Sequence, residues 1–517
     1  MEYKHSSEFT KCEWRSDIYT ETGADYSLPD YNGDVRRILF TSADVRPSGS
    51  FDSGDGIDFS GIVVYNMVYS DSENKINSVS FTSDYDLSVK CDMDKCKSSS
   101  ADISVANYSM RLLGPRKISA KATLMPKVVI AKTEKQEIEG SAFSDGASPE
   151  VEVASLEIAS VASSERLERE YAEELVRLDG EGADDVAVIF TDAECVIDSV
   201  SSEEQSATVK GVVRVYAILK CGDEPMFLAE KNIRIDENLP FENLNRGIKI
   251  SPDVTVSSVR CAVSADEGGC SVVANVILEL GAEIYSNEQV ELVTDAYRRD
   301  AETENSYEQY DYLEICTVIS EKEEFNHTLS RDEVEVENLR EVICISAQPK
   351  IERCEVLDGV ACIAGEIKYS GIASGMDDSG SLSYSPFKVA FPFEKNVNLN
   401  CQSEAKIRVS PSICSTMANV VIDENNLRVS SLSHTKLFVC EEKSVKVLGC
   451  SELLESCEVA PIGAKITVYY PEERETLFEI AKKFHTTAEK ISKDNSISRA
   501  VSADAEAGIG VKRLLIF

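Results

Sequence analysis

The fold is decided by three short stretches that are related to one another. They read Ile38-Leu-Phe-Thr-Ser-Ala-Asp-Val45, Val188-Ile-Phe-Thr-Asp-Ala-Glu-Cys195 and Val342-Ile-Cys-Ile-Ser-Ala-Gln-Pro349. The alanine that they share stands at positions 43, 193 and 347, so the copies lie 150 and then 154 residues apart. Such regular self-similarity indicates an internal repeat.

Two further landmarks follow each copy in the same order. The first begins with a glycine: Gly61-Ile-Val-Val-Tyr-Asn-Met-Val-Tyr69, Gly211-Val-Val-Arg-Val-Tyr-Ala-Ile-Leu219 and, with slightly shifted spacing, Gly359-Val-Ala-Cys-Ile-Ala-Gly-Glu-Ile-Lys-Tyr369. The second is short and strand-like: Val79-Ser-Phe81, Asn232-Ile-Arg-Ile235 and Lys388-Val-Ala-Phe391. We therefore interpret most of the chain as three repeats, spanning about 10–140, 150–300 and 310–455.

The repeats are predicted to be β structure. Val, Ile, Tyr and Thr alternate with polar residues in short runs, as in Val272–Leu280, and this period of two is typical of strands. One stretch conflicts, because Ser164–Leu178 carries apolar residues at helical spacing. The matching place in the first repeat, Thr20–Pro29, contains Gly and Pro, which oppose a helix. We therefore expect Ser164–Leu178 to be a strand, with linkers at Gly140–Pro149, Arg299–Gln309 and Glu455–Gly463.

Charge and composition exclude several classes of function. The 517 residues hold 53 Lys+Arg and 91 Asp+Glu, a net charge of −38. Such a field repels nucleic acid and anionic lipid surfaces, so a basic protein partner fits better. The beginning, Met1–Glu8, lacks the apolar segment of a secretory signal, and no apolar run is long enough to span a membrane. We therefore predict a chain that stays in the compartment where it is made, with its sixteen scattered cysteines as reduced, small apolar residues.

No enzymatic constellation emerges from the residue spacings. The four histidines are isolated, no phosphate-binding glycine loop is present, and no pair of carboxylates stands out from the rest. We predict neither a catalytic residue, nor a metal site, nor a cofactor. The tyrosines of the glycine-led stretches are more typical of core or cross-strand packing than of a binding platform; they are Tyr65, Tyr69, Tyr216 and Tyr369.

The last 53 residues have a different character. Lys465–Phe517 holds nine basic and eight acidic residues, a net of +1, so the acidity belongs to the repeats. Ile466–Tyr470 alternates like a strand, and Leu514–Phe517 reads as another. Between them, Thr476-Leu-Phe-Glu479 and Thr486-Thr-Ala-Glu489 have the spacing of helix capping boxes. The pattern predicts a β-α-α-β unit.

This unit resembles the LysM domain. The resemblance covers 465–517 and rests on Thr476-Leu-Phe-Glu-Ile-Ala481, the second cap at Thr486-Thr487, Asn495 and the terminal strand. LysM domains bind N-acetylglucosamine-containing glycans in a shallow groove between two loops. The resemblance places that groove at Tyr470, Arg474, Glu475, Thr476, Leu477, Asn495 and Ile497. Arg474-Glu475 stands where LysM domains usually carry Gly-Asp, and this difference counts against glycan binding.

The three repeats resemble the SPOCS domain of spore-coat-associated proteins. The resemblance rests on the glycine-led strands at Gly61 and Gly211 and on Glu291-Leu-Val-Thr-Asp-Ala-Tyr297. Three SPOCS copies followed by one LysM domain resemble the SipL-type spore-coat assembly proteins. That resemblance implies a mother-cell cytoplasmic protein, recruited to the forespore surface, whose LysM domain binds a SpoIVA-like coat morphogenetic ATPase.

The sequence thus leads to one expectation and one alternative. We expect a mainly β, non-enzymatic adaptor of spore-coat or envelope assembly, with three SPOCS-like domains that bind other coat proteins and a LysM domain that binds the coat ATPase. The alternative is a LysM protein that binds peptidoglycan or another N-acetylglucosamine polymer of the cell wall or spore cortex.

Overall fold

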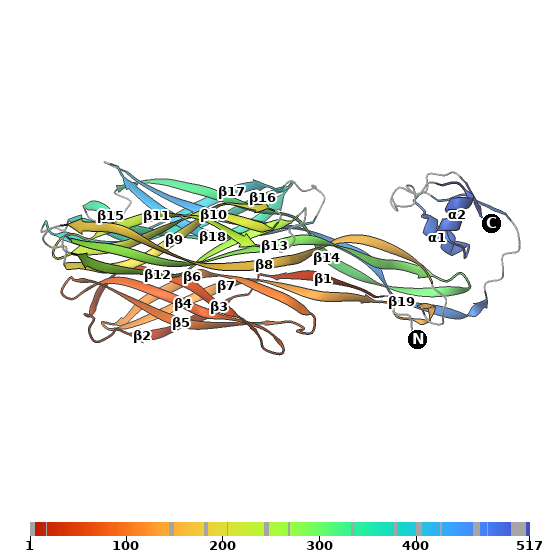
Figure 1. Ribbon diagram of the computed structural model, residues 1–517, viewed down its shortest axis with the longest axis horizontal. Helices are drawn as coiled ribbons and strands as arrows, with labels where there is room; N and C mark the ends of the chain where they lie inside the picture. Colours follow the sequence, from red (N-terminus) through yellow and green to blue (C-terminus); the bar gives the residue numbers. More distant parts are fainter. Residues whose placement is uncertain are drawn as a thin grey trace.

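The chain is mainly β, as the alternation of apolar and polar residues predicts. The computed structural model describes residues 6–16, 18–143, 149–179, 185–203, 205–241, 248–266, 269–331, 336, 338–376, 380–399, 406–423, 426–458, 466–472, 474–497 and 513–516. Most of these residues lie in long antiparallel strands, and two short helices occur near the end of the chain (Figure 1). Neither helix in this described part is long and apolar enough to cross a membrane.

The strands form three consecutive sets, which we call the first, second and third repeats. The first contains β1 (Ser6–Arg15), β2 (Thr20–Ser27), β3 (Val35–Asp52), β4 (Gly56–Asp71), β5 (Ile76–Lys90), β6 (Cys96–Gly114) and β7 (Lys117–Glu137), followed by the 3-10 turn η1 (Ser141–Phe143). The second contains β8 (Glu150–Asp179), β9 (Val186–Glu203), β10 (Ser206–Cys221), β11 (Phe227–Pro240), β12 (Lys249–Asp266) and β13 (Gly269–Tyr297). The third contains β14 (Ala301–Ser330), β15 (Leu339–Leu357), β16 (Val360–Met376), β17 (Leu382–Asn398), β18 (Ile407–Ile422) and β19 (Asn426–Glu458).

Each repeat has the same topology of two antiparallel sheets. In the second repeat the last strand, β13, lies between β12 and the first strand, β8, in the order β12-β13-β8. Strands β11-β10-β9 form the other sheet. The third repeat repeats both orders with β14-β19-β18 and β15-β16-β17. In the first repeat the opening strand is broken in two, so β1 and β2 both pair with β7.

The pairing registers correct one alignment of the repeats. Gly61, Gly211 and Gly365 occupy the same place on β4, β10 and β16, four residues before the positions that pair with Ala43, Ala193 and Ala347. Gly365 is therefore the third equivalent glycine, and its spacing is the same 150 and 154 residues. Our alignment on Gly359 was wrong, because that glycine lies in the β15–β16 turn with a φ of +75°.

These three glycines are required by a close backbone approach. A Cβ at Gly61 would lie 2.5 Å from the carbonyl oxygen of Arg46, and one at Gly211 would lie 2.5 Å from that of Val196. A Cβ at Gly365 would lie only 2.1 Å from the carbonyl oxygen of Lys350 on the adjacent strand. At each place the register with the preceding strand shifts nearby, as in a β-bulge. The repeated glycine in the sequence therefore reports a repeated bulge in the sheet.

The two sheets of a repeat enclose an apolar core. Tyr65, Tyr69 and Tyr369 are among the largest fully buried side chains, and Tyr216 is also buried, so the prediction that these tyrosines pack in cores is confirmed. The stretch Ser164–Leu178 is part of strand β8, which confirms the expected strand. Leu167, Tyr171 and Leu175 of this stretch pack against the core of the second repeat, so their helical spacing has no structural counterpart.

One predicted linker is wrong. Residues from Ala301 onward belong to β14, so only the first two residues of the expected linker at 299–309 lie outside a strand. The charges that suggested a linker alternate along β14, where Glu302, Glu304 and Glu308 point outward. Most of the expected linker at 455–463 lies outside the described residues or continues β19 to Glu458.

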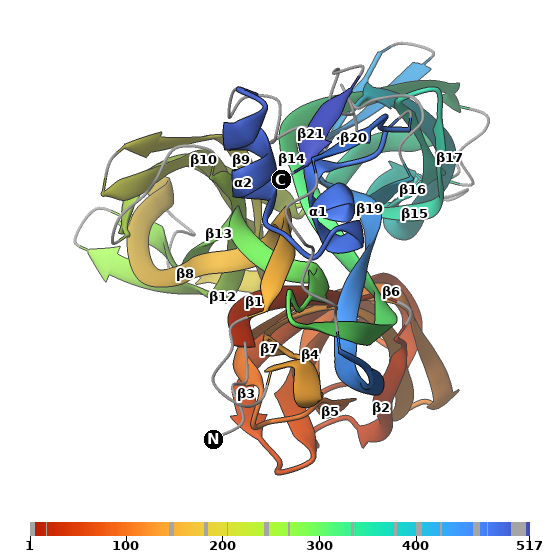
Figure 2. The same ribbon diagram turned by 90° about the vertical axis from the view of Figure 1, so that its right-hand side faces the viewer.

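The three repeats lie side by side around a common axis (Figure 2). An apolar cluster joins them where equivalent positions meet, at Phe40, Phe190 and Cys344 and at Val68, Ile218 and Ile372. Phe40 and Phe190 contact each other edge to face, with ring centroids 5.5 Å apart. The same sequence landmarks that define the repeats therefore also bring them together.

We call the part where the three repeats surround this axis the head. Away from the head, the longest strands continue as a stalk (Figure 1). β8, β13, β14 and β19 have 30, 29, 30 and 33 residues, and a strand of 30 residues spans roughly 100 Å. The paired ends β1–β7, β8–β13 and β14–β19 pack around a second apolar cluster that includes Phe9, Ile158 and Leu292. At the tip of the stalk lies the C-terminal module, which the structure describes at residues 466–472, 474–497 and 513–516 (Figure 1).

Candidate functional site

The C-terminal module has the predicted β-α-α-β order. It consists of β20 (Thr467–Tyr469), α1 (Leu477–Lys483), α2 (Ala488–Asp494) and β21 (Leu514–Ile516), with β20 and β21 antiparallel. Leu477, Ile480 and Ile491 from the helices pack against Leu514 and Ile516. The apolar side chains whose spacing predicted the helices therefore face the sheet.

Both helices begin at threonine caps. The Thr476 hydroxyl accepts the backbone N–H of Glu479 at 3.1 Å, and the Glu479 carboxylate accepts the N–H of Thr476 at 2.7 Å, which confirms the predicted capping box. The second cap is Thr487, whose hydroxyl accepts the N–H of Lys490 at 3.1 Å. The predicted box starting at Thr486 is therefore displaced by one residue.

Several of the seven predicted groove residues have structural roles. Leu477 is buried in the core of the module. The side-chain amide of Asn495 donates to the carbonyl oxygens of Ile491 at 2.9 Å and Leu515 at 2.7 Å, while its oxygen accepts the N–H of Leu515. Ile497 packs against the same core. These residues join the second helix to β21 and leave few groups to contact a ligand.

Glu475 is also committed to the module itself. Its carboxylate accepts hydrogen bonds from the Tyr469 hydroxyl at 2.9 Å, from the backbone N–H of Glu472 at 3.0 Å and from Lys483. Burial raises the pKa of this carboxyl, but these hydrogen bonds outweigh burial and bring the pKa below its ordinary value. Glu475 therefore holds the loop before α1 in place.

Arg474 has a backbone conformation that favours glycine. Its φ is +72°, in the left-handed region that glycine adopts without the steric cost of a Cβ. The side chain is exposed. The loop thus places an exposed guanidinium at a position whose backbone conformation suits glycine, beside the predicted groove.

One exposed surface of the module is an apolar sheet face, of which the sequence analysis named Tyr470 alone, as a groove residue. Ile466 is 63% exposed, Val468 49%, Tyr470 68% and Leu515 38%, and Val468 pairs with Leu515 across the two strands. We call these four residues the outer sheet face. The alternation in Ile466–Tyr470 could have revealed it, since helices on one side of a two-stranded sheet leave the other side open.

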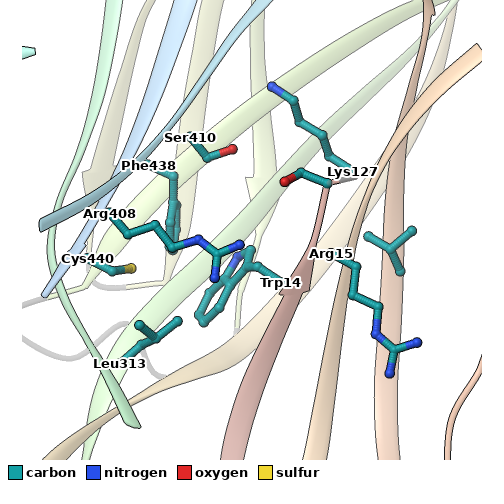
Figure 3. A pocket seen from close by; sticks show the side chains of 10 residues that line it. Trp14, Arg15, Lys127, Leu313, Arg408, Ser410, Phe438 and Cys440 are labelled. Carbon is teal, nitrogen blue, oxygen red and sulfur yellow. The ribbon is translucent and has the colours of Figure 1, made fainter. Parts of the chain in front are cut away.

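A second candidate site lies on the axis of the head. A cavity of about 810 Å³ is lined by strands of all three repeats, among them β3, β9 and β15. A neighbouring cavity of about 90 Å³ shares Asp102, Lys127 and Asp253 with it and reaches Trp14. An aromatic cluster lies there, formed by one residue from each repeat: Trp14, Tyr285 and Phe438. The ring centroids of Trp14 and Phe438 are 5.0 Å apart. Figure 3 shows Trp14 beside Phe438, Arg408 and Leu313.

Carboxylates from two repeats gather in the large cavity. Asp44 comes from β3, and Asp192 and Glu194 come from β9. Glu194 accepts hydrogen bonds from Arg214 at 2.5 Å and from the backbone N–H of Ala418 in the third repeat at 3.2 Å. The guanidinium of Arg214 also donates to the carbonyl oxygen of Ala418 at 2.5 Å. This ion pair therefore links the second and third repeats.

Burial shifts the pKa of each of these acids upward. It raises the pKa of Glu194 to about 7 despite the nearby Arg214. Burial and the charge of Asp44 raise the pKa of Asp192 well above its usual range, and the pKa of Asp44 is also raised by burial. A carboxyl with a higher pKa in the folded chain binds its proton more tightly there, so its stabilising contribution is lost as the pH rises through that pKa.

Replacing Asp192 with asparagine is therefore expected to stabilise the protein at alkaline pH. The asparagine side chain keeps an oxygen for the backbone N–H of Ala193, which Asp192 accepts at 2.8 Å, but it removes the buried charge. We expect a melting temperature about 2 °C higher than the wild type at pH 8 and a shrinking difference as the pH falls to about 4.5. Thermal melts at several pH values measure this, with Asp84→Asn on an exposed strand position as control. A pH-independent difference would contradict the prediction.

The described residues bring together no group of three or more His, Cys, Asp or Glu side chains that could hold a metal ion. The cysteines that the structure describes are free thiols, and Cys440 is buried whereas Cys362 is partly buried. Comparisons with protein-family models, with curated proteins and with solved structures gave no significant match to the chain.

Proposed function

We propose that this chain is a non-enzymatic adaptor of bacterial spore-coat assembly, whose C-terminal module binds a SpoIVA-like coat morphogenetic ATPase and whose repeats bind other coat proteins. The proposal rests on the resemblance of the domain order to SipL-type proteins. It is supported by the outer sheet face, where four apolar side chains are exposed at one end of a long molecule. Exposed apolar side chains that are contiguous favour contact with another protein.

The charges around the module agree with a protein contact. Arg474 and Arg513 are exposed, and Arg513 directly precedes β21. They lie on a module of net charge +1 joined to repeats that carry −39. An apolar centre with arginines at its margin is typical of protein interfaces. The glycan alternative has less support, because Glu475, Leu477 and Asn495 of the predicted groove are committed within the module.

Replacing Val468 with aspartate is expected to weaken partner binding strongly without unfolding the module. Val468 is half exposed at the centre of the outer sheet face, so a charge there costs little in the free protein but is buried unpaired in the complex. We expect the affinity of the full-length chain for the purified coat ATPase to fall at least about tenfold. Biolayer interferometry measures this, with Lys493→Ala on the exposed side of α2 as control.

The alternative makes the opposite prediction. Sedimentation of the full-length chain with insoluble peptidoglycan, together with no measurable binding to the ATPase, would contradict the adaptor proposal. A protein-binding module is expected to remain in the supernatant. Unchanged ATPase affinity in Val468→Asp would place the contact elsewhere and remove the support that the outer sheet face gives.

A further inference from the structure

The end of β13 in the second repeat contacts the C-terminal module across 187 residues of sequence. The Asp295 carboxylate forms an ion pair with Lys482 of α1, with distances of 2.8 and 2.6 Å from Nζ to the two oxygens. Asp295 is held in position by the side-chain amide of Asn305 at 2.6 Å and the hydroxyl of Tyr307 at 3.0 Å, both on β14. Two repeats thus orient one carboxylate toward the module.

Tyr297 extends the contact into the core of the module. Its side chain is only 3% exposed and belongs to the same apolar cluster as Leu477 and Ile480. The ring packs edge to face against Phe478, with centroids 5.1 Å apart, and the hydroxyl donates to the carbonyl oxygen of Thr486 at 2.6 Å. The stalk therefore supplies a core residue that the module does not encode.

A third contact closes the edge of this interface. His485, in the turn after α1, places Nδ1 3.3 Å from the carbonyl oxygen of Arg298. Arg298 is 8% exposed and pairs with Asp300 at 2.5 Å, so this carbonyl is held on an ordered segment. These three contacts fall on residues 295–298 of the stalk and on α1 and the turn that follows it.

The contacts leave the outward surfaces of the module free. Phe478, Lys482 and His485 face the stalk, whereas Tyr470 and Arg474 precede α1 and remain exposed. The outer sheet face lies on the side of β20 and β21 that the helices do not cover. The module is thus attached by one surface and presents the others to solvent.

We propose that residues 295–298 form a receptor site for the chain's own C-terminal module, which fixes its orientation at the tip of the stalk and completes its core. About 50 residues are near the lower limit for an independently stable domain, so one added aromatic residue has a large effect. Local unfolding of the module is then coupled to release of its contact with the second repeat. This inference concerns a contact within the chain and is independent of the partner that the module binds.

Hydrogen exchange of the full-length chain tests the receptor site. Lys482→Glu sets two carboxylates against each other at the interface, while Lys482 is partly exposed and is not part of the module's apolar core. We expect amide exchange in α1 to become at least tenfold faster, and Lys482→Arg to restore slow exchange. Lys493→Glu makes the same charge change on the exposed side of α2 and is expected to leave exchange in α1 unchanged.

The orientation of the module relative to the stalk gives a second readout. A purely local effect on α1 would not change it. Spin labels at exposed Val153 on β8 and at Lys493 are expected to give a narrow distance distribution in the otherwise unchanged chain and a broad one in Lys482→Glu. Equal exchange rates and equal distributions in both proteins would overturn the proposal. A distribution that depends on protein concentration would also overturn it, because the module would then dock on a second copy.

Discussion

Replacing Gly365 with alanine is expected to destabilise the third repeat severely. The added Cβ would lie 2.1 Å from the carbonyl oxygen of Lys350 and 2.8 Å from the Phe393 ring, so the backbone of two paired strands must separate. Forced overpacking of this kind against backbone atoms is expected to cost at least about 3 kcal/mol. That is a large fraction of the stability of an ordinary domain.

Chemical denaturation followed by circular dichroism measures the loss, and a matched glycine provides the control. Gly281 also lies in a long strand, β13, but a Cβ there would meet its nearest atom at 3.6 Å, an ordinary contact. Gly281→Ala is therefore expected to be neutral or slightly stabilising, by about 0.5 kcal/mol. If both variants lost the same stability, the close approach at the bulge would not be what requires Gly365.

Replacing Phe190 with alanine is expected to unfold all three repeats at a lower denaturant concentration. Phe190 is buried in the cluster on the axis, where it contacts Phe40 of the first repeat and Tyr216 of its own. Removing a buried phenylalanine side chain is expected to cost about 3–4 kcal/mol. Because equivalent residues of three repeats share this cluster, the loss is not confined to the second repeat.

The single tryptophan allows this cooperativity to be measured. Trp14 belongs to the first repeat and lies in the aromatic cluster with Tyr285 and Phe438, so its fluorescence reports on a contact of all three repeats. We expect the fluorescence midpoint of Phe190→Ala to fall together with the midpoint from circular dichroism. Phe51→Ala, at a side chain that is 53% exposed, is expected to change stability by less than about 0.5 kcal/mol. An unchanged Trp14 midpoint in Phe190→Ala would mean that the repeats unfold independently.

The β character of the chain could be predicted because alternation survives in every repeat. The strand at Ser164–Leu178 was predicted by comparing copies, since its own apolar spacing favours a helix. The third glycine was misplaced because Gly359 also precedes an apolar run; the 154-residue spacing from Gly211 already points to Gly365, and the pairing of Ala347 with Tyr369 confirms it. The charged start of β14 looked like a linker because a strand with one face exposed to solvent can carry an acid at every second position.

The arrangement around the axis could not be predicted from the sequence. No local pattern shows that Phe40, Phe190 and Cys344 meet, since the contacts between repeats depend on how whole sheets pack. The capping box at Thr476 was predicted, because its hydrogen bonds lie within four residues. The groove residues came from a resemblance, which gives positions but not burial, and Glu475 and Leu477 prove to be inside the module.

The pairing at the two ends of each repeat has a consequence for how the repeats are joined. Ser6 pairs with Glu137, Glu150 with Tyr297, and Ala301 with Glu458, so every repeat starts and finishes at the tip of the stalk. Joining such units in tandem therefore needs only short connectors, such as the one between Tyr297 and Ala301. Repeated units can then carry different residues at their ends, and the end of the second repeat carries Asp295 and Tyr297, which contact the C-terminal module.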